Sequence, residues 1–129
     1  MIKTKSIYES IENSDGTRIL ITRYWPRGIK KEHFDIWHKD LSPSKKLLKD
    51  YKEGRIDFKL FEQLFSNEIS KNENVINICK NIAKEALDGK EFTLLCYEKD
   101  ESHCHRKLIR KLCDHEVSKL IQEQKRIKN

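Results

Sequence analysis

A short apolar run that ends in a cluster of reactive side chains constrains this chain more than any other feature. Residues 92–97 are nearly uncharged and rich in aliphatic and aromatic side chains, as expected for a strand buried on both faces. Apolar residues then recur at helical spacing over residues 108–121. Cys104, His105 and Arg106 stand at the expected start of that helix. The first-turn amides of a helix lack intrahelical partners and favour an anion or a thiolate, so we expect a site at this strand-loop-helix junction.

Length and composition narrow the class of protein. The chain has 129 residues, which suits one domain around a single core. No apolar run approaches the roughly 20 residues of a membrane span, and the basic N-terminal segment lacks the apolar stretch of a secretory signal. We therefore predict a cytoplasmic protein without a membrane segment. The net charge of +6 is compatible with acidic partners, but Lys and Glu are interleaved along the chain, so charge alone does not establish nucleic-acid binding.

The four cysteines are expected to be free thiols. Cys79, Cys96, Cys104 and Cys113 could pair, but no two of them have Cys-x-x-Cys spacing. Cys79 and Cys113 fall on core-facing positions of expected helices, where cysteine behaves as a small hydrophobic residue. We predict that these two are unpaired and unreactive.

The N-terminal half is expected to supply three strands. Residues 3–8 and 18–24 have strand character and are joined by a polar segment that ends in Asp15-Gly16, a strong turn signal, so we predict a β-hairpin. Residues 34–41 are ambiguous, and a short strand is favoured over an irregular segment.

Three further helices are expected between these strands and residues 92–97. One begins at Ser42-Pro43-Ser44 and ends at Gly54, the next begins after Asp57, and a third covers residues 75–86 before Asp88-Gly89. The whole pattern predicts one compact α/β domain over residues 1–129, with a small mixed β-sheet of about four strands flanked by helices. Residues 122–129 form a charged helical end that is expected to fray.

A second candidate site lies in the loop at residues 25–28, which reads Trp-Pro-Arg-Gly. Pro26 fixes its own φ angle and Gly28 permits a turn that a side chain would block, so Arg27 is held on a constrained bend. Arg23 comes just before this loop, and Trp25 offers an apolar wall beside it. A connecting loop without a function rarely needs this combination.

Cys104 and His105 are the candidate catalytic residues. A helix start with neighbouring His105 and Arg106 lowers a thiol pKa from about 8.5 toward neutrality, which makes Cys104 a candidate nucleophile. The alternative is a purely structural Cys104 packed against the sheet, a common role for buried cysteine. Acidic residues would suit a structural helix start better than His105 and Arg106, so we favour a site. His105 is the acid/base candidate because imidazole titrates at about pH 6.5.

Two other interpretations of these residues are less favoured. Cys96 superficially resembles the cysteine of phosphatase and sulfurtransferase loops, but Ser102 stands where such a loop requires arginine. Cys96, His103, Cys104 and His105 are suitable metal ligands by type, but adjacent residues rarely all reach one ion and the spacing is not that of structural zinc. We therefore expect no metal, and the sequence identifies no cofactor.

Three arginines suggest an anionic ligand. Arg23, Arg27 and Arg106 would form a clamp if the two loops open on the same edge of the sheet, because guanidinium groups grip carboxylate or phosphate in two places. The alternative is three surface salt bridges, which are individually weak. We expect a small enzyme or enzyme-like domain that binds a phosphate-bearing, nucleotide-like ligand, with Trp25 as an apolar wall.

A noncatalytic function is the competing hypothesis. The last helix carries a cluster of cations that would contact a nucleic acid or a protein partner: Arg106, Lys107, Arg110, Lys111 and Lys119.

Residues 15–28, from Asp15-Gly16 to Arg27-Gly28, resemble the small prokaryotic proteins catalogued as domain of unknown function 488. Cys104-His105-Arg106 is also similar to a motif of the wider family. Thr22 departs from the pattern, because many relatives carry aspartate there, and an acid role at that position is therefore absent. Further matches follow in order: Lys31, Trp37, residues 41–44, Leu47, Phe61, Glu68 and residues 93–95. The resemblance implies a compact cytoplasmic α/β domain with its site at the two loops.

Overall fold

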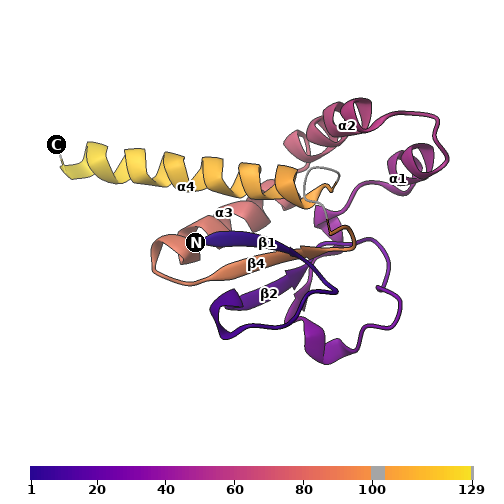
Figure 1. The fold of residues 1–129 in the computed structure, drawn as a ribbon. Helices are drawn as coiled ribbons and strands as arrows, with labels where there is room; N and C mark the ends of the chain where they lie inside the picture. The colour runs from indigo at the N-terminus through magenta and orange to yellow at the C-terminus, as the bar shows by residue number, and fades with distance from the viewer. Residues whose placement is uncertain (100–103, 129) are drawn as a thin grey trace.

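The computed structural model describes residues 1–99 and 104–128 and shows an α/β fold (Figure 1). The sheet has four strands in the order β1-β4-β2-β3. The strands are β1 (Ile2–Ser6), β2 (Thr17–Leu20), β3 (Ile36–Trp37) and β4 (Phe92–Cys96), and the helices are α1 (Lys45–Lys52), α2 (Phe58–Ser70), α3 (Glu73–Leu87) and α4 (Arg106–Lys128). Short 3-10 turns occur at Asn13–Asp15, Lys31–His33 and Lys39–Leu41. The predicted fold class, the number of strands and the four helices are confirmed.

The strand order corrects the predicted hairpin. β4 lies between β1 and β2, and all three strand pairings are parallel, so the sheet is parallel rather than mixed. All five residues of β4 are buried, and the most apolar strand therefore occupies the centre of the sheet. Asp15-Gly16 does turn the chain, but β2, which follows the turn, pairs with β4 and not with β1. Gly16 has a φ of +63°, and a Cβ there would collide with the Glu91 carbonyl.

The helices begin and end where the capping residues indicate. The Ser44 side chain accepts a hydrogen bond from the Leu47 amide at the start of α1, and Asp57 accepts one from Leu60 at the start of α2. Residues 122–128, the end expected to fray, belong to α4, and from Ile121 to Ile127 the helix is exposed and extends past the sheet (Figure 1).

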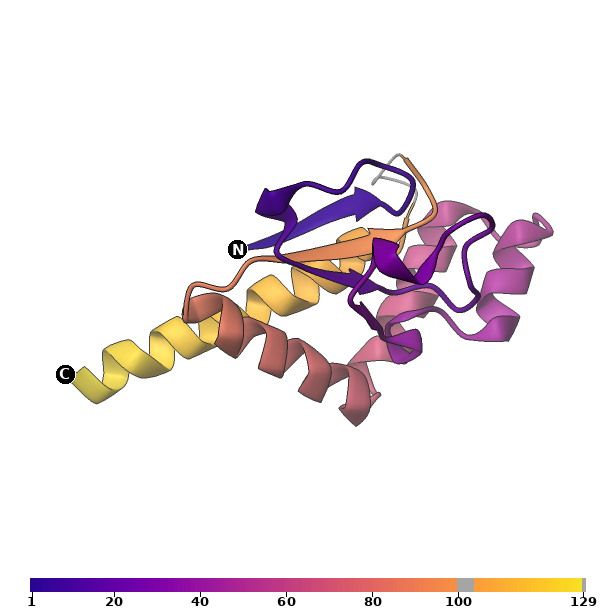
Figure 2. The same cartoon turned by 90° about the horizontal axis from the view of Figure 1, so that it is seen from below.

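The core is asymmetric about the sheet. α3 and α4 cover one face, with α1 and α2 beside the end where the strands finish (Figure 2). The main cluster between sheet and helices contains Ile19, Leu94, Phe65, Ile82 and Ile109, all nearly inaccessible. A smaller cluster on the other face is covered by the segment that follows β2. Across the described residues, no helix combines the length and the apolar character needed to cross a membrane.

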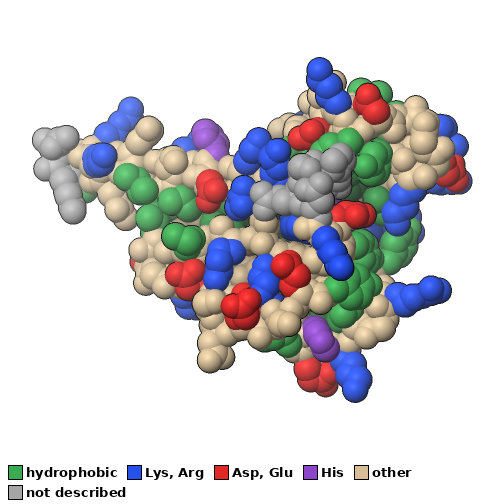
Figure 3. All heavy atoms as spheres, in the orientation of Figure 1, with side chains coloured by type: hydrophobic (Ala, Val, Ile, Leu, Met, Phe, Trp, Pro, Cys, Tyr) green, Lys and Arg blue, Asp and Glu red, His purple; other side chains and the backbone are tan. Residues whose placement is uncertain are grey.

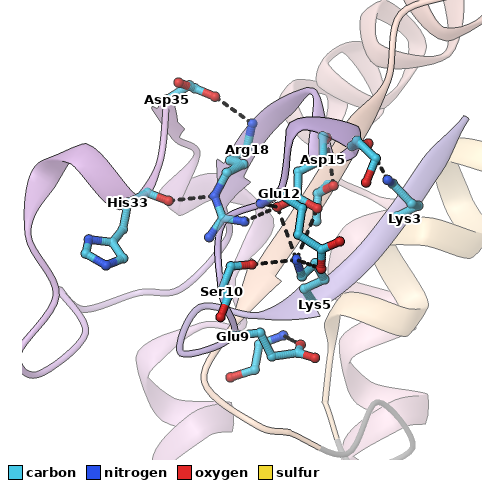
Figure 4. A network of polar contacts seen from close by, with 12 residues as sticks. Lys3, Lys5, Glu9, Ser10, Glu12, Asp15, Arg18, His33 and Asp35 are labelled. Carbon is cyan, nitrogen blue, oxygen red and sulfur yellow. Dashed lines mark hydrogen bonds and ion pairs between the residues drawn. The ribbon is translucent and has the colours of Figure 1, made fainter.

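A buried polar network ties β1, β2 and β4 together (Figure 4). Asp15 is 2% exposed and lies 2.5 Å from Arg18 Nη1, with Lys5 Nζ 3.1 Å from its carboxylate. Thr93 Oγ1 donates a hydrogen bond to the Asp15 carbonyl at 2.8 Å, which connects the network to β4. Burial opposes ionisation of Asp15, but the Glu12 amide, Lys5 and Arg18 outweigh it, so the pKa of Asp15 is lowered.

Ile82→Ala should lower the free energy of unfolding by about 2–5 kcal/mol, because the side chain fills the core at 4% exposure. The matched comparison is Arg27→Ala on the exposed loop, which should change it by less than about 0.5 kcal/mol. Urea denaturation of both variants measures the difference. Equal losses would show that Arg27 is a structural residue.

Candidate functional site

The candidate site lies at the edge of the sheet where its parallel strands end. β2 ends at Leu20 and β4 at Cys96, and because both run parallel, the segments that follow them emerge on the same side. The Tyr97 hydroxyl donates to the Tyr24 carbonyl, which joins these two segments directly. Ligands of open α/β sheets bind outside this edge. The segments that follow β2 and β4 therefore share this edge, which is the condition that the predicted arginine clamp requires.

A pocket of about 80 Å³ opens at this edge. Its wall comes from five parts of the chain: the segments after β2 and β4, the start of α4, and the facing sides of α1 and α2. A space of this size accepts a small oxyanion or the reacting end of a larger ligand, not a whole nucleotide. The lining residues are Thr22, Arg23, Pro43, Leu48, Tyr51, Lys52, Phe61, Cys96, Tyr97, Glu98, Cys104 and His105.

Cys104 and His105 are both buried on this wall. His105 Nε2 lies 2.6 Å from the Ile21 carbonyl oxygen, which only accepts, so Nε2 carries the proton of that hydrogen bond. The other ring nitrogen, Nδ1, lies 3.4 Å from Cys96 Sγ and 3.9 Å from Cys104 Sγ. The edge-on contact with Phe65, at 5.5 Å between ring centroids, also fixes the imidazole. The ring thus faces both sulfurs in one orientation.

The two sulfurs differ in protonation. The pKa of Cys104 is lowered from its usual range to about 4, chiefly by hydrogen bonding from the Cys96 thiol and then by His105 and the Arg106 amide, against the opposing effect of burial. Burial raises the pKa of Cys96 well above its usual range, and the neighbouring Cys104 adds to this effect. The two opposite shifts favour ionisation of Cys104 over ionisation of Cys96.

Cys96, Cys104 and His105 also have the right ligand types for a soft metal ion, and their donor atoms lie within 4.8 Å of one another. Their directions do not suit an ion. Cys96 Sγ lies 3.4 Å from Nδ1 and 3.9 Å from Nε2, so it sits against the ring rather than along the Nδ1 lone pair. An ion on that lone pair would reach Cys96 only after the ring turned away from Ile21. His103, the fourth residue weighed for this role, and Ser102 lie outside the described residues.

Arg106 holds the backbone after β4. Its side chain is 2% exposed, Nη1 donates to the Glu98 carbonyl, and Nη2 donates to the Lys99 carbonyl at 3.1 Å. The guanidinium therefore lies behind the loop and outside the pocket lining. The sequence pattern suggests an anion contact, but the structure gives Arg106 a positioning role.

Arg23 is the arginine of the predicted clamp that lines the pocket. It is half-buried, and Nε donates to the Pro43 carbonyl at 2.7 Å. Among the described residues, its Nη atoms have no hydrogen-bond partner. Arg23 is thus anchored at one side of the guanidinium and has donors left for a ligand.

The loop at residues 25–28 lies outside this pocket. Trp25 is 46% exposed, stacks edge-on against Phe34 and Trp37, and donates from Nε1 to the Ile29 carbonyl. Arg27 is exposed, and its carbonyl accepts a hydrogen bond from the Tyr8 hydroxyl at 3.0 Å. The two motifs share an edge of the sheet, but Trp25 and Arg27 are not among the residues that line the pocket beside Cys104.

Sequence reasoning missed two contributors to the site. Cys96 was weighed only as a loop nucleophile or a metal ligand, although its place at the end of the central strand brings it beside Cys104. The helical spacing of Tyr51 and Phe61 is typical of core residues, but in the structure they also form one wall of the pocket. The spacing of Tyr51 and Phe61 shows that both side chains face inward. It does not show that the pocket lies next to them.

Comparisons with known proteins identify the family of this chain. Residues 2–116 match the family model DUF488-N3a, described as the active DUF488-N3 subclade. The uncharacterized protein YeaO of Escherichia coli (strain K12) is 35% identical over 106 residues, which cover 81% of this chain and 89% of YeaO. The uncharacterized protein Rv3073c of Mycobacterium tuberculosis (strain ATCC 25618 / H37Rv) is 36% identical over 70 residues, or 53% of this chain and 59% of that protein. No solved structure gives a significant match. The chain belongs to the DUF488 family.

Proposed function

We propose that this protein is a small cysteine-dependent enzyme that binds an anionic, phosphate-bearing, nucleotide-like ligand at the carboxyl edge of its sheet. The observation that carries the proposal is the position of Cys104, which lines a pocket beside His105 and Arg23 and whose pKa is lowered. Thiolates attack electrophilic centres, and an adjacent imidazole supplies or removes the proton that the leaving group or water requires.

The charges around the pocket suit an anion. Arg23 and Lys52 line it with two positive groups, and the N-terminal end of the α4 dipole adds partial positive charge. Glu98 is the one carboxylate among the lining residues. In this proposal Arg23 contacts the anion, and Arg106 fixes the segment that carries Glu98.

The small volume of the pocket places the rest of a nucleotide-sized ligand outside it. About 80 Å³ is well below the roughly 300–1,000 Å³ of sites that enclose a drug-sized ligand. We therefore assign the reacting end to the pocket, and the remainder to the rim towards Trp25 and Arg27, where an exposed indole and a guanidinium offer stacking and charge. The free thiols suit the reducing conditions of the cytoplasm, where we place the protein.

A thermal-shift screen with nucleotides and simple oxyanions tests the proposal. A ligand at 100 times its Kd should stabilise the protein by about 2.7 kcal/mol. Arg23→Ala should remove that shift, while Arg55→Ala, an exposed arginine paired with Asp50, should keep it. The proposal fails if no nucleotide or oxyanion stabilises the protein, or if both variants respond like the wild type.

The nucleic-acid alternative predicts a different outcome of the same screen. Of the five cations expected on α4, Arg106 is buried and Lys119 lies 3.6 Å from Glu116. Basic and acidic side chains are interspersed on the face seen in Figure 3. The affinity for oligonucleotides is measured as the salt concentration rises. If it falls steeply, and the affinity for mononucleotides does not, the result favours a noncatalytic nucleic-acid-binding module over the enzyme.

Alkylation of Cys104 should be nearly independent of pH between about 6 and 8. For a thiol with a pKa of about 8.5, the thiolate fraction falls roughly tenfold for each pH unit below that value. Cys104 has a pKa of about 4 and therefore stays ionised until the pH falls through that value. Site-resolved mass spectrometry after brief iodoacetamide treatment measures the rate, and the urea-unfolded chain serves as the control. A tenfold drop per unit in the folded protein would mean that Cys104 is an ordinary thiol.

A further inference from the structure

We propose that Cys96 and Cys104 form a dithiol that reduces small hydroperoxides and closes into an intramolecular disulfide. The inference shares Cys104 with the proposed function but requires no anionic ligand. Both sulfurs are unpaired, lie within 4.8 Å of each other and line the same pocket. A disulfide needs the two atoms about 2.05 Å apart, and rotation of the side chains can supply that approach.

The two cysteines have complementary states. The lowered pKa of Cys104 favours the thiolate, the form that attacks a peroxide, and the raised pKa of Cys96 favours its thiol. The imidazole of His105 packs against both sulfurs, with Nδ1 3.4 Å from Cys96 Sγ and 3.9 Å from Cys104 Sγ. An attacking sulfur and a resolving sulfur are therefore close together before any oxidant arrives.

The chemistry balances with one hydroperoxide for each disulfide. The Cys104 thiolate attacks the terminal peroxide oxygen, the S–O bond forms, and the O–O bond breaks to release hydroxide or alkoxide. Cys96 then gives up its proton and attacks the Cys104 sulfur, so that the S–S bond forms and the S–O bond breaks. That proton leaves with the departing hydroxide as water. The two sulfurs lose two electrons, and the peroxide gains them.

The second cysteine pair provides a comparison within the same molecule. Cys79 on α3 and Cys113 on α4 are also neighbours, but both are 0% exposed in the core. The Cys79 thiol and burial raise the pKa of Cys113, so Cys113 remains protonated. Close sulfurs alone do not make a reactive dithiol; the pocket and the thiolate distinguish Cys96 and Cys104.

The size of the pocket predicts selectivity among oxidants. Cys96 and Cys104 are 2% and 3% exposed, and access runs through a space of about 80 Å³. Hydrogen peroxide fits that space. The aromatic ring of cumene hydroperoxide would clash with the wall formed by Tyr51 and Phe61. Hydrogen peroxide should therefore oxidise the folded protein faster.

The test is hydrogen peroxide treatment of the reduced full chain, followed by alkylation and peptide mapping. The expected result is loss of two of the four thiols, with Cys96 and Cys104 joined in one monomeric chain. Cys104→Ser should abolish the reaction, and Cys96→Ser should leave a sulfenic acid on Cys104 that dimedone traps. Cys79→Ser is the matched control and should form the same disulfide as the wild type.

Three results would overturn the inference: four intact thiols in the wild type, a disulfide that joins Cys79 to Cys113, or a disulfide between chains. Wild-type mapping decides the question even if a variant fails to fold. Ligand binding is measured separately on the reduced protein. A disulfide without any nucleotide or oxyanion binding would keep this inference and remove the proposed function.

Discussion

Asp15→Asn lowers the free energy of unfolding by about 3–5 kcal/mol, because it leaves a buried cation without its counter-charge. Arg18 is 4% exposed, and its Nη1 bonds to the Asp15 carboxylate. The same carboxylate accepts from Lys5 and from the Glu12 amide, so one substitution disturbs the link between β1 and β2. Urea denaturation at neutral pH gives the value.

The pH dependence of stability identifies the same interaction. The pKa of Asp15 is lowered on folding, so its contribution is present above the unfolded value of about 3.9 and is lost as the pH falls through the lower folded value. The wild type should lose this contribution in acid, and Asp15→Asn should not. Asp50→Asn, which breaks an exposed pair with Arg55, should cost less than about 1 kcal/mol. Equal losses in the two variants would contradict a structural role for the buried network.

Cys104→Ser should reduce turnover of any substrate found in the ligand screen by at least about a thousandfold, since a hydroxyl does not ionise at neutral pH and loses the covalent step. The fold should persist, because serine is close to cysteine in size. Cys79→Ala is the control: it changes a core sulfur outside the pocket lining and should keep turnover in the folded fraction. Activity assays with thermal melts of both variants separate lost chemistry from lost structure. Turnover of the serine variant at the wild-type rate would remove Cys104 from the reaction.

The helices were predictable because their signals are local. The stripe that includes Phe61, Phe65 and Ile69 repeats at three and four residues, and Ser44 and Asp57 cap the helices that follow them. The central strand was predictable for a similar reason, since residues 92–97 are too apolar for an exposed position. These features depend on neighbours within a few residues.

The sheet order and the details of the site depend on contacts that are distant in sequence. Asp15-Gly16 signals a turn, but the signal does not reveal that β4, more than 70 residues later, takes the place between β1 and β2. Arg106 and Arg23 looked equivalent as cations. In the structure Arg106 donates hydrogen bonds to two backbone carbonyls after β4, whereas Arg23 lines the pocket. The two arginines differ because the chain packs differently around each of them.

The most direct test of the proposed site is protection of Cys104 from alkylation by a ligand that stabilises the protein. The rate of iodoacetamide modification is measured for each cysteine by mass spectrometry, with and without the best nucleotide or oxyanion from the screen. The account predicts that Cys104 reacts first, that the ligand slows its modification, and that Arg23→Ala removes the protection. First modification at another cysteine, or a stabilising ligand that leaves the Cys104 rate unchanged, would place the binding site elsewhere.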